Sequence, residues 1–259
     1  MTEVLAYIGA DPNLVAGALH RFADGIKDVE GARACGLGFE QESRMLVRKR
    51  PLARPETVNL ARQGSDLRTR AFVGHLSTAR GTAPDNLQPF RWRSWLFAAV
   101  GNVPIPESRP AVLDALPDFL RRNVQGQSAA ELVFHQFLLR LKALSVDVAH
   151  PAIPHDDVLA ALVDTAAEFD EDAGLVLTDS RRIFAVSTGS QLAWAQVDGI
   201  RSWREKPLFA GHEPKRVDYP HMRAVALAST GDVVDGWSTV EPGTAVALRV
   251  DGLIEARSV

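Results

Sequence analysis

A chain of 259 residues with 46% hydrophobic and 24% charged residues has the composition of an ordinary folded globule, which excludes a disordered chain. Its 29 basic and 32 acidic residues leave a formal net charge of -3, so no global field favours nucleic acid or an anionic membrane. We expect one domain over residues 1–259, with no nucleic acid and no membrane among its partners.

Cysteine usage and the N-terminal segment bear on the compartment. Cys35 is the single cysteine, so an intramolecular disulfide cannot form. The N-terminal residues contain no basic segment before an apolar run, and no stretch reaches the roughly 18 apolar residues of a membrane span. We therefore expect a cytoplasmic protein that is neither secreted nor inserted in a membrane.

The first half of the chain is expected to consist mostly of strands. The apolar run Val4–Ile8 predicts a buried strand that ends at Gly9. Asp11 and Pro12 predict the N-cap and first-turn proline of a helix that continues to about Ala23. Further strands are expected at Gly36–Phe39, Arg44–Val47, Ala71–His75 and Trp95–Val100.

The second half is expected to add helices and then return to strands. Ser108 predicts the N-cap of a helix with apolar residues at helical spacing through Leu120. Two more helices are expected at Ser128–Leu144 and from His155 to about Phe169. Strands with a final hairpin turn at Asp251–Gly252 should follow, at Leu175–Leu177, Ile183–Ser187, Leu192–Val197, Ala224–Ala228 and Ala245–Val250. Two packed sheets flanked by helices fit this order.

Motifs that bind cofactors or metals are scarce in this sequence. It contains no phosphate-binding glycine loop, no paired cysteines and no helical pair of histidines. His150 and His155 are close in sequence, but two prolines separate them, which disfavours a metal site. We expect no cofactor and no metal.

Five stretches follow one another in an order and spacing that a known family shares. They are Met1–Gly9, Gly36–Phe39, Gly74–Gly81, Asn86–Gly101 and Gly126–Phe134. They resemble class II glutamine amidotransferase domains, in particular the small stand-alone kind. The matching features there are the first strand, a glycine-rich strand, a histidine-led strand, an Asn-x-His-Pro-Phe turn before a Phe-x-His-Asn-Gly strand, and an Asp-Ser-Glu helix start.

The resemblance covers nearly the whole chain, because the pattern from Ala228 to Gly252 fits the family's last strands. It implies an α+β fold, the four-layer αββα sandwich of two mainly antiparallel sheets found in N-terminal-nucleophile hydrolases. The alternative is an unrelated α/β protein with chance matches.

The side chains with which that family binds and cleaves glutamine are replaced here. The family's nucleophile is a cysteine directly after the initiator methionine, and this position is Thr2, a hydroxyl that becomes terminal only if the methionine is removed. The arginine that holds the substrate carboxylate corresponds to Ser77, and the aspartate that holds its ammonium group corresponds to Ala129. The oxyanion-binding asparagine corresponds to Val100, so only the backbone N–H of Gly101 remains.

Other residues are weaker candidates for chemistry. Arg80, Arg91 and Arg93 are close enough in sequence to the replaced positions to bind an anion near the old pocket, or they are solvated surface arginines. Cys35 is interpreted as a small core residue, with a reactive thiol as the alternative.

These replacements predict a pseudoenzyme, a catalytically degenerate class II amidotransferase-like protein without glutaminase activity. We expect it to act as a binding or assembly subunit with an unknown protein partner, for which an active homologue or a synthetase is a candidate. One alternative is an N-terminal threonine amidohydrolase of different specificity that uses Thr2, and another is a residual glutamine amidotransferase.

Overall fold

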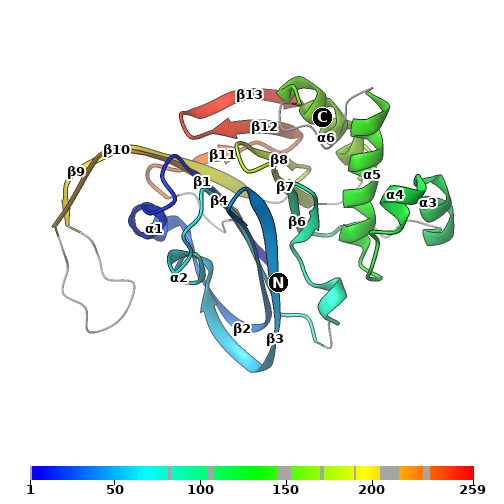
Figure 1. Cartoon of the computed structure of the whole chain (residues 1–259), viewed down its shortest axis with the longest axis horizontal. Coiled ribbons are helices and arrows are strands. Elements are labelled where there is room, and N and C mark those ends of the chain that lie inside the picture. The colour runs from blue at the N-terminus through cyan, green and yellow to red at the C-terminus, as the bar shows by residue number, and fades with distance from the viewer. Residues whose placement is uncertain are drawn as a thin grey trace.

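The computed structural model of the chain describes residues 2–80, 83–103, 108–144, 153–169, 172–189, 191–204, 216–229 and 234–259. These residues form two antiparallel sheets packed face to face, with helices on the outer faces (Figure 1). The α+β sandwich expected from the resemblance is confirmed.

Each sheet is antiparallel throughout its described strands. One sheet has seven described strands in the order β11-β9-β10-β1-β4-β2-β3, with the bounds β1 Thr2–Gly9, β2 Asp28–Gln41, β3 Arg44–Asn59, β4 Ala71–Ser77, β9 Leu192–Arg204, β10 Arg216–Ser229 and β11 Ser238–Val240. The other has six described strands in the order β13-β12-β8-β7-β6-β5, with the bounds β5 Phe90–Trp92, β6 Trp95–Gly101, β7 Ala173–Thr178, β8 Ile183–Ser187, β12 Thr244–Arg249 and β13 Gly252–Ser258.

The helices lie at both outer faces of the sandwich and in the connections. Their bounds are α1 Val15–Phe22, α2 Leu60–Ser65, α3 Arg109–Ala115, α4 Asp118–Arg121, α5 Ala129–Ala143 and α6 His155–Ala166. Figure 1 shows α1 and α2 beside the seven-stranded sheet, and α5 and α6 on the opposite side of the molecule.

The buried apolar side chains of the described residues form three clusters, one for each interface between layers. One cluster lies between α1, α2 and the seven-stranded sheet and includes Leu19 and Phe72. A second lies between the two sheets and includes Val4 and Ala98, and a third joins the six-stranded sheet to α5 and α6 through residues such as Phe137. Three apolar interfaces fit a four-layer arrangement.

The N-terminal strand occupies the position expected from its apolar run. β1 pairs with β10 on one side and with β4 on the other, so Val4–Ile8 forms part of a central strand. Its residues Val4, Leu5 and Ile8 are at most 1% exposed. A strand covered on both faces needs apolar residues at successive positions, which explains the continuous run.

Two predicted helices differ from the observed ones. The Asp11 carboxylate accepts hydrogen bonds from the Asn13 backbone and side chain, which closes a local turn, and α1 therefore begins only at Val15. The helix that Ser108 caps ends early, because Pro117 lacks an N–H and holds the preceding residue extended. α3 and α4 replace the single helix that was predicted.

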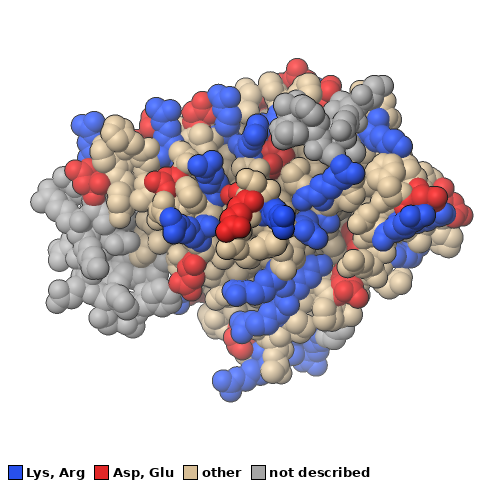
Figure 2. All heavy atoms as spheres, in the orientation of Figure 1, with Lys and Arg blue, Asp and Glu red and all other residues tan. Residues whose placement is uncertain are grey.

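The strands β2 and β3 are much longer than the short runs predicted for them. Their pairing continues past register shifts near Val29 and Ala32, which interrupt the alternation that marks a strand in sequence. β3 is the edge strand of its sheet, so Pro51 and Pro55 are tolerated there. Figure 2 shows basic side chains gathered over the lower centre of the molecule, where β3 runs in Figure 1. Charge on an edge strand opposes pairing with another chain.

The membrane prediction can be compared with the helices directly. No helix among the residues described above is long and apolar enough to cross a membrane.

Candidate functional site

The start of β1 and the end of β4 meet across the seven-stranded sheet. Thr2 is the direct register partner of Ser77, and Ser77 in turn pairs with Ala34 of β2. Ser77 is 7% exposed, and its Oγ accepts the N–H of Ala79 at 3.1 Å. The register thus places these two predicted site positions side by side, and both offer hydroxyl groups.

Val100 and Gly101 end β6 in the facing sheet. The Val100 side chain is 3% exposed and belongs to the apolar cluster between the sheets, together with Val4 and Ala98. Gly101 is exposed and has a φ of 76°, a left-handed conformation that favours glycine. The polar atoms that these two positions provide are therefore those of the backbone.

The segment before α5 is held by two residues that belong to the resemblance. Glu131 accepts the N–H of Gln125 at 2.9 Å and the N–H of Gly126 at 2.7 Å. The side-chain oxygen of Asn86 accepts the N–H of Gln127. Ala129, the first residue of α5, is half-buried beside this support and contributes only a methyl group. Glu131 and Asn86 therefore have a structural role that does not depend on catalysis.

Two polar side chains, those of His75 and Gln88, hydrogen-bond the backbone of the same β6 residue, Ala99. The buried His75 ring, 4% exposed, hydrogen-bonds the Ala99 carbonyl, and burial lowers the pKa of His75 to about 4. The Gln88 side chain accepts the Ala99 N–H at 2.6 Å and donates to the Ala99 carbonyl at 3.2 Å. Gln88 occupies the histidine position of the Asn-x-His-Pro-Phe turn, and its role was not predicted from the sequence. An amide side chain has both a donor and an acceptor, so it can pair with the N–H and the C=O of one residue. The presence of glutamine at position 88 is the feature of the sequence that could have predicted this role.

No protein-family model matches the sequence, and no curated protein matches it. Solved structures do resemble the fold. The predicted glutamine amidotransferase from Pseudomonas aeruginosa PA01 superposes with a TM-score of 0.64 at 16% identity, over 98% of this chain and 99% of that chain. The glutamine aminotransferase class-II domain protein from Silicibacter pomeroyi superposes with a TM-score of 0.52 at 16% identity, over 99% and 98%. The glutamine phosphoribosylpyrophosphate amidotransferase from B. subtilis gives 0.53 at 15% identity, over 99% of this chain and 49% of that chain.

The chain has the class II glutamine amidotransferase fold. This likeness concerns the fold, and the activity depends on the side chains at the site. In this chain Thr2 pairs with Ser77 and Val100 lies in the last part of β6, and the correspondence of these positions with the family's site stays a prediction.

Two of the three candidate arginines lie together. Arg91 and Arg93 line a surface hollow of about 410 Å³ that Arg44 also lines. Arg91 donates to the Met45 carbonyl at 2.8 Å, and the Arg93 guanidinium lies 4.8 Å from the centre of the Trp92 ring. Their contacts are with a backbone group and an aromatic face.

The third arginine lies elsewhere. The hollow lined by Arg91 and Arg93 adjoins the turn between β2 and β3, and Phe72 at the start of β4 pairs with Phe39 near that turn. Ser77 is at the other end of β4, and the exposed Arg80 follows it. The three arginines therefore do not line one hollow.

Cys35 is 5% exposed, in the cluster beneath α1 and α2. Burial raises the pKa of the Cys35 thiol, and the charges of Arg50 and Arg48 oppose this effect. A raised pKa reduces the thiolate fraction, which favours the core interpretation over a reactive thiol.

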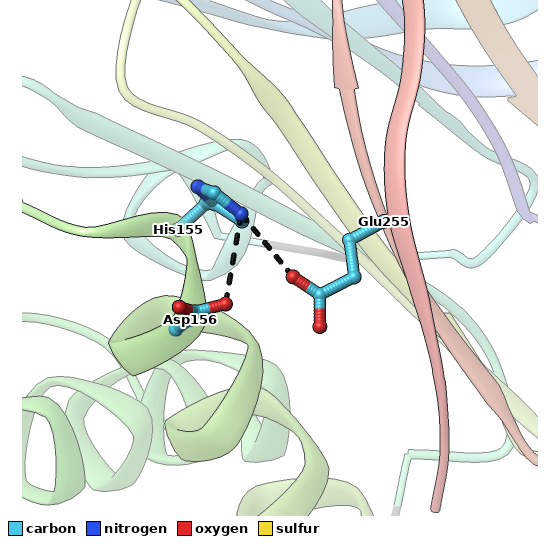
Figure 3. Close-up of side chains that lie close together, drawn as sticks. All are labelled: His155, Asp156 and Glu255. Atoms are coloured by element: carbon cyan, nitrogen blue, oxygen red, sulfur yellow. Dashed lines mark ion pairs between the residues drawn. The ribbon is translucent and has the colours of Figure 1, made fainter.

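A cluster of possible metal ligands joins α6 to β13 (Figure 3). His155 Nε2 lies 3.2 Å from a Glu255 oxygen and 3.6 Å from an Asp156 oxygen. Arg257 already pairs with Asp156 at 2.7 Å and also with Glu255. A cation would have to bind beside this guanidinium, so we assign the cluster as an ion-pair network. His150, the other histidine considered for a metal, lies outside the described residues.

Proposed function

We propose that this protein is a non-catalytic member of the class II amidotransferase fold that serves as a binding or assembly subunit. The observation that carries the proposal is the burial of the Val100 side chain among apolar residues, at the position where the resemblance expects an oxyanion-binding asparagine. The replacement of the expected arginine by Ser77 and of the expected aspartate by Ala129 supports it.

The magnitudes favour loss of glutamine turnover. Removing one oxyanion donor typically costs about 100- to 1,000-fold in rate. A lost hydrogen bond to a charged group costs about 1.5–3 kcal/mol, and two such contacts are missing. Together the replacements are expected to lower glutamine turnover by about four decades or more, before the weaker threonine nucleophile is considered.

Ammonia release from glutamine by the purified chain tests the enzymatic half of the proposal. We expect no release above that of a Thr2→Ala variant, and no labelling of residue 2 by glutamine-mimicking electrophiles. Glutaminase activity that Thr2→Ala abolishes would refute the proposal. A measurement of the intact mass of the chain distinguishes the threonine amidohydrolase alternative from this proposal, because that activity requires a chain that begins at Thr2.

Native-size fractionation tests the assembly half. In an extract from cells with endogenous expression levels, the 28.2 kDa chain is expected to migrate with a larger species of defined mass. Dilution or added salt should release the chain from this larger species in one discrete step, without intermediate masses. Migration at the monomer mass under all conditions would overturn the assembly role, whatever the glutaminase assay shows.

A further inference from the structure

β3 is the edge strand of the seven-stranded sheet, and among the described strands it pairs with β2 alone (Figure 1). The turn between them consists of Glu42 and Ser43, whose φ angles are 50° and 63°. Positive φ at both positions is typical of a type I′ turn, which closes a two-residue hairpin. The flanking residues Gln41 and Arg44 then form a hydrogen-bonded pair, and such pairs alternate along an antiparallel ladder. The hairpin therefore fixes which backbone groups of β3 point away from β2.

This alternation directs the backbone groups of Met45, Val47 and Lys49 to the outer edge of the sheet. The register has no shift between the turn and Pro51, so the alternation holds over the whole stretch. The Met45 carbonyl accepts a hydrogen bond from Arg91, a residue of the other sheet, which agrees with an outward direction. Pro51, which has no N–H to donate, belongs to the same outward set, as expected of a proline in an edge strand.

The free part of this outer edge extends from Val47 to Lys49. Among the described residues, no backbone hydrogen bond joins either of them to an element other than β2. Both residues are half-buried, and both line a hollow of about 300 Å³ that Glu131 and His135 also line. Open space therefore lies beside this stretch of the strand. Unpaired N–H and C=O groups at a sheet edge form a template for one more strand.

Arg48 and Arg50 give one face of this stretch a positive charge. Both are exposed, and alternate residues of a strand point to the same face. The charges of both act on the Cys35 thiol, which agrees with a shared face. Arg48 has no ion pair in the part of the chain that the structure describes, and Arg50 lies 3.9 Å from Glu56. Positive charge repels a second copy of β3 and attracts an acidic strand.

The other face of the stretch carries Val47 and Lys49 and favours different side chains. The Lys49 Nζ lies 4.8 Å from the centre of the Phe90 ring, and the charges of Glu131 and Asp85 already act on it. Both of these acidic residues line the hollow, so they repel further carboxylates on this face. Apolar side chains suit the surface of Val47 and Phe90. A complementary strand therefore alternates acidic and apolar residues.

We propose that the outer edge of β3 from Val47 to Lys49 binds an extended acidic segment of a partner protein as an added antiparallel strand. Its acidic side chains lie beside Arg48 and Arg50, and its apolar side chains lie opposite Val47 and Lys49. This proposal rests on the binding or assembly role proposed above and gives the chemistry of the partner.

Fluorescence polarisation of the full chain with labelled peptides tests the charge pattern. The probe is a short peptide of alternating valine and glutamate, for which we expect saturable binding. The matched peptide of alternating valine and lysine should bind at least about tenfold more weakly, because its charges oppose those of Arg48 and Arg50. No binding of the valine–glutamate peptide, or equal binding of the two, would overturn the proposal.

Two N-methylated isomers of the probe test the strand pairing on the unmodified chain. In the antiparallel arrangement, the residues opposite Val47 and Lys49 direct their N–H groups at β3, and those opposite Arg48 and Arg50 direct theirs away. Methylation of the valine nitrogens should therefore weaken binding at least about tenfold, whereas methylation of the glutamate nitrogens should change it by less than about twofold. Equal effects of the two isomers, or the reverse order, would refute this arrangement.

A charge reversal assigns the binding to the two arginines. Arg48→Glu with Arg50→Glu should invert the preference, so that the valine–lysine peptide binds more tightly than the valine–glutamate peptide. Arg122→Glu with Arg201→Glu is the matched control, because both arginines are exposed, the change in charge is the same, and neither lies in β3. An unchanged preference in the folded β3 variant would sink the charge contact.

Val47→Pro tests the backbone of the edge. The substitution removes an outward N–H, leaves the bonds to β2 in place, and resembles the natural Pro51 in its position in the alternation. It should weaken peptide binding about fivefold or more without a change in charge. Equal affinity of the folded variant would contradict the proposal. If the variant fails to fold, the methylated peptides decide the same question on the unmodified chain.

A second copy of the chain is the competing occupant of this edge, and sedimentation velocity of the chain alone tests it. We expect a monomer, because two basic strands repel each other. A concentration-dependent dimer that Val47→Pro abolishes would overturn the proposal.

Peptide binding and assembly can fail separately. Binding of the valine–glutamate peptide by a chain that migrates in extracts at its monomer mass would support the edge site and overturn the assembly role. Migration with a larger species, together with no binding of the peptide, would leave the assembly role in place and overturn the site at β3.

Discussion

Thr2 and Ser77 are direct cross-strand partners, at the point where β1 begins and β4 ends. Directly opposed residues in an antiparallel pair have β-carbons about 4.5–5.5 Å apart. A long side chain at position 77 therefore reaches the space in front of residue 2. This adjacency makes the correspondence with the amidotransferase pocket testable by repair.

The repair variant is Ser77→Arg with Ala129→Asp, which supplies a guanidinium for a carboxylate and a carboxylate for an ammonium group. We expect L-glutamine, but not D-glutamine, to raise the melting temperature of this variant. At ten times Kd, linkage gives about 1.4 kcal/mol, a rise of about 3–5 °C. Val100→Asn is left out, because an amide among apolar side chains costs about 1–3 kcal/mol. Ser77→Arg alone is the matched control. No stabilisation of the folded double variant at millimolar glutamine would show that the correspondence is wrong.

Gly36 is predicted to be intolerant of any side chain. A β-carbon there would lie 1.8 Å from the Gln88 carbonyl oxygen, a backbone atom that cannot move aside easily. Gly36→Ala should lower the free energy of unfolding by about 3 kcal/mol, measured in urea. Gly17→Ala in α1 is the control, since its nearest contact is a Tyr219 side-chain atom at 3.2 Å and alanine favours helix. Equal losses in the two variants would contradict this explanation.

His75 should make stability depend on pH. Its pKa falls from the ordinary value of 6.5 to about 4 because the buried ring disfavours the charged form. Between these values the unfolded state binds more protons, so stability is complete above about pH 6.5 and is lost as the pH falls toward 4. The full effect is up to about 3 kcal/mol.

Urea unfolding of the protein and of His75→Gln between pH 4.5 and 7 measures this contribution. The variant should be less stable at pH 7 and should lose less stability on acidification. Parallel pH profiles for the two proteins would show that another group is responsible, and His135, whose pKa is also lowered by burial, would be the next residue to replace.

Glu131 is predicted to require a carboxylate rather than an amide. Both of its oxygens accept backbone N–H groups, and a glutamine would turn an NH₂ toward one of them. Glu131→Gln should therefore lower the free energy of unfolding by about 2–3 kcal/mol. Glu168→Gln, at a more exposed ion pair with Arg140, should change it by less than about 1 kcal/mol. Comparable losses at both positions would argue against the bonding role of Glu131.

The sequence by itself determined the elements whose apolar pattern matches their burial. Val4–Ile8 predicts a central strand because successive apolar residues suit a strand covered on both faces, and Ser128–Leu144 predicts α5 for a similar local reason. The order of the five resembling stretches indicated the fold. Their glycine, proline and histidine residues occupy positions where two backbone segments lie very close together, such as Gly36 and Gln88.

The tertiary structure alone decided the rest. The length of β2 and β3 depends on pairing between distant residues, which continues through bulges that erase the local alternation. The burial of Val100 depends on the facing sheet. Lys49, Glu131 and His135 meet at one hollow although 82 residues separate the first two along the chain. Sequence spacing predicts neighbours only within one helix or strand, and such meetings arise when two layers pack.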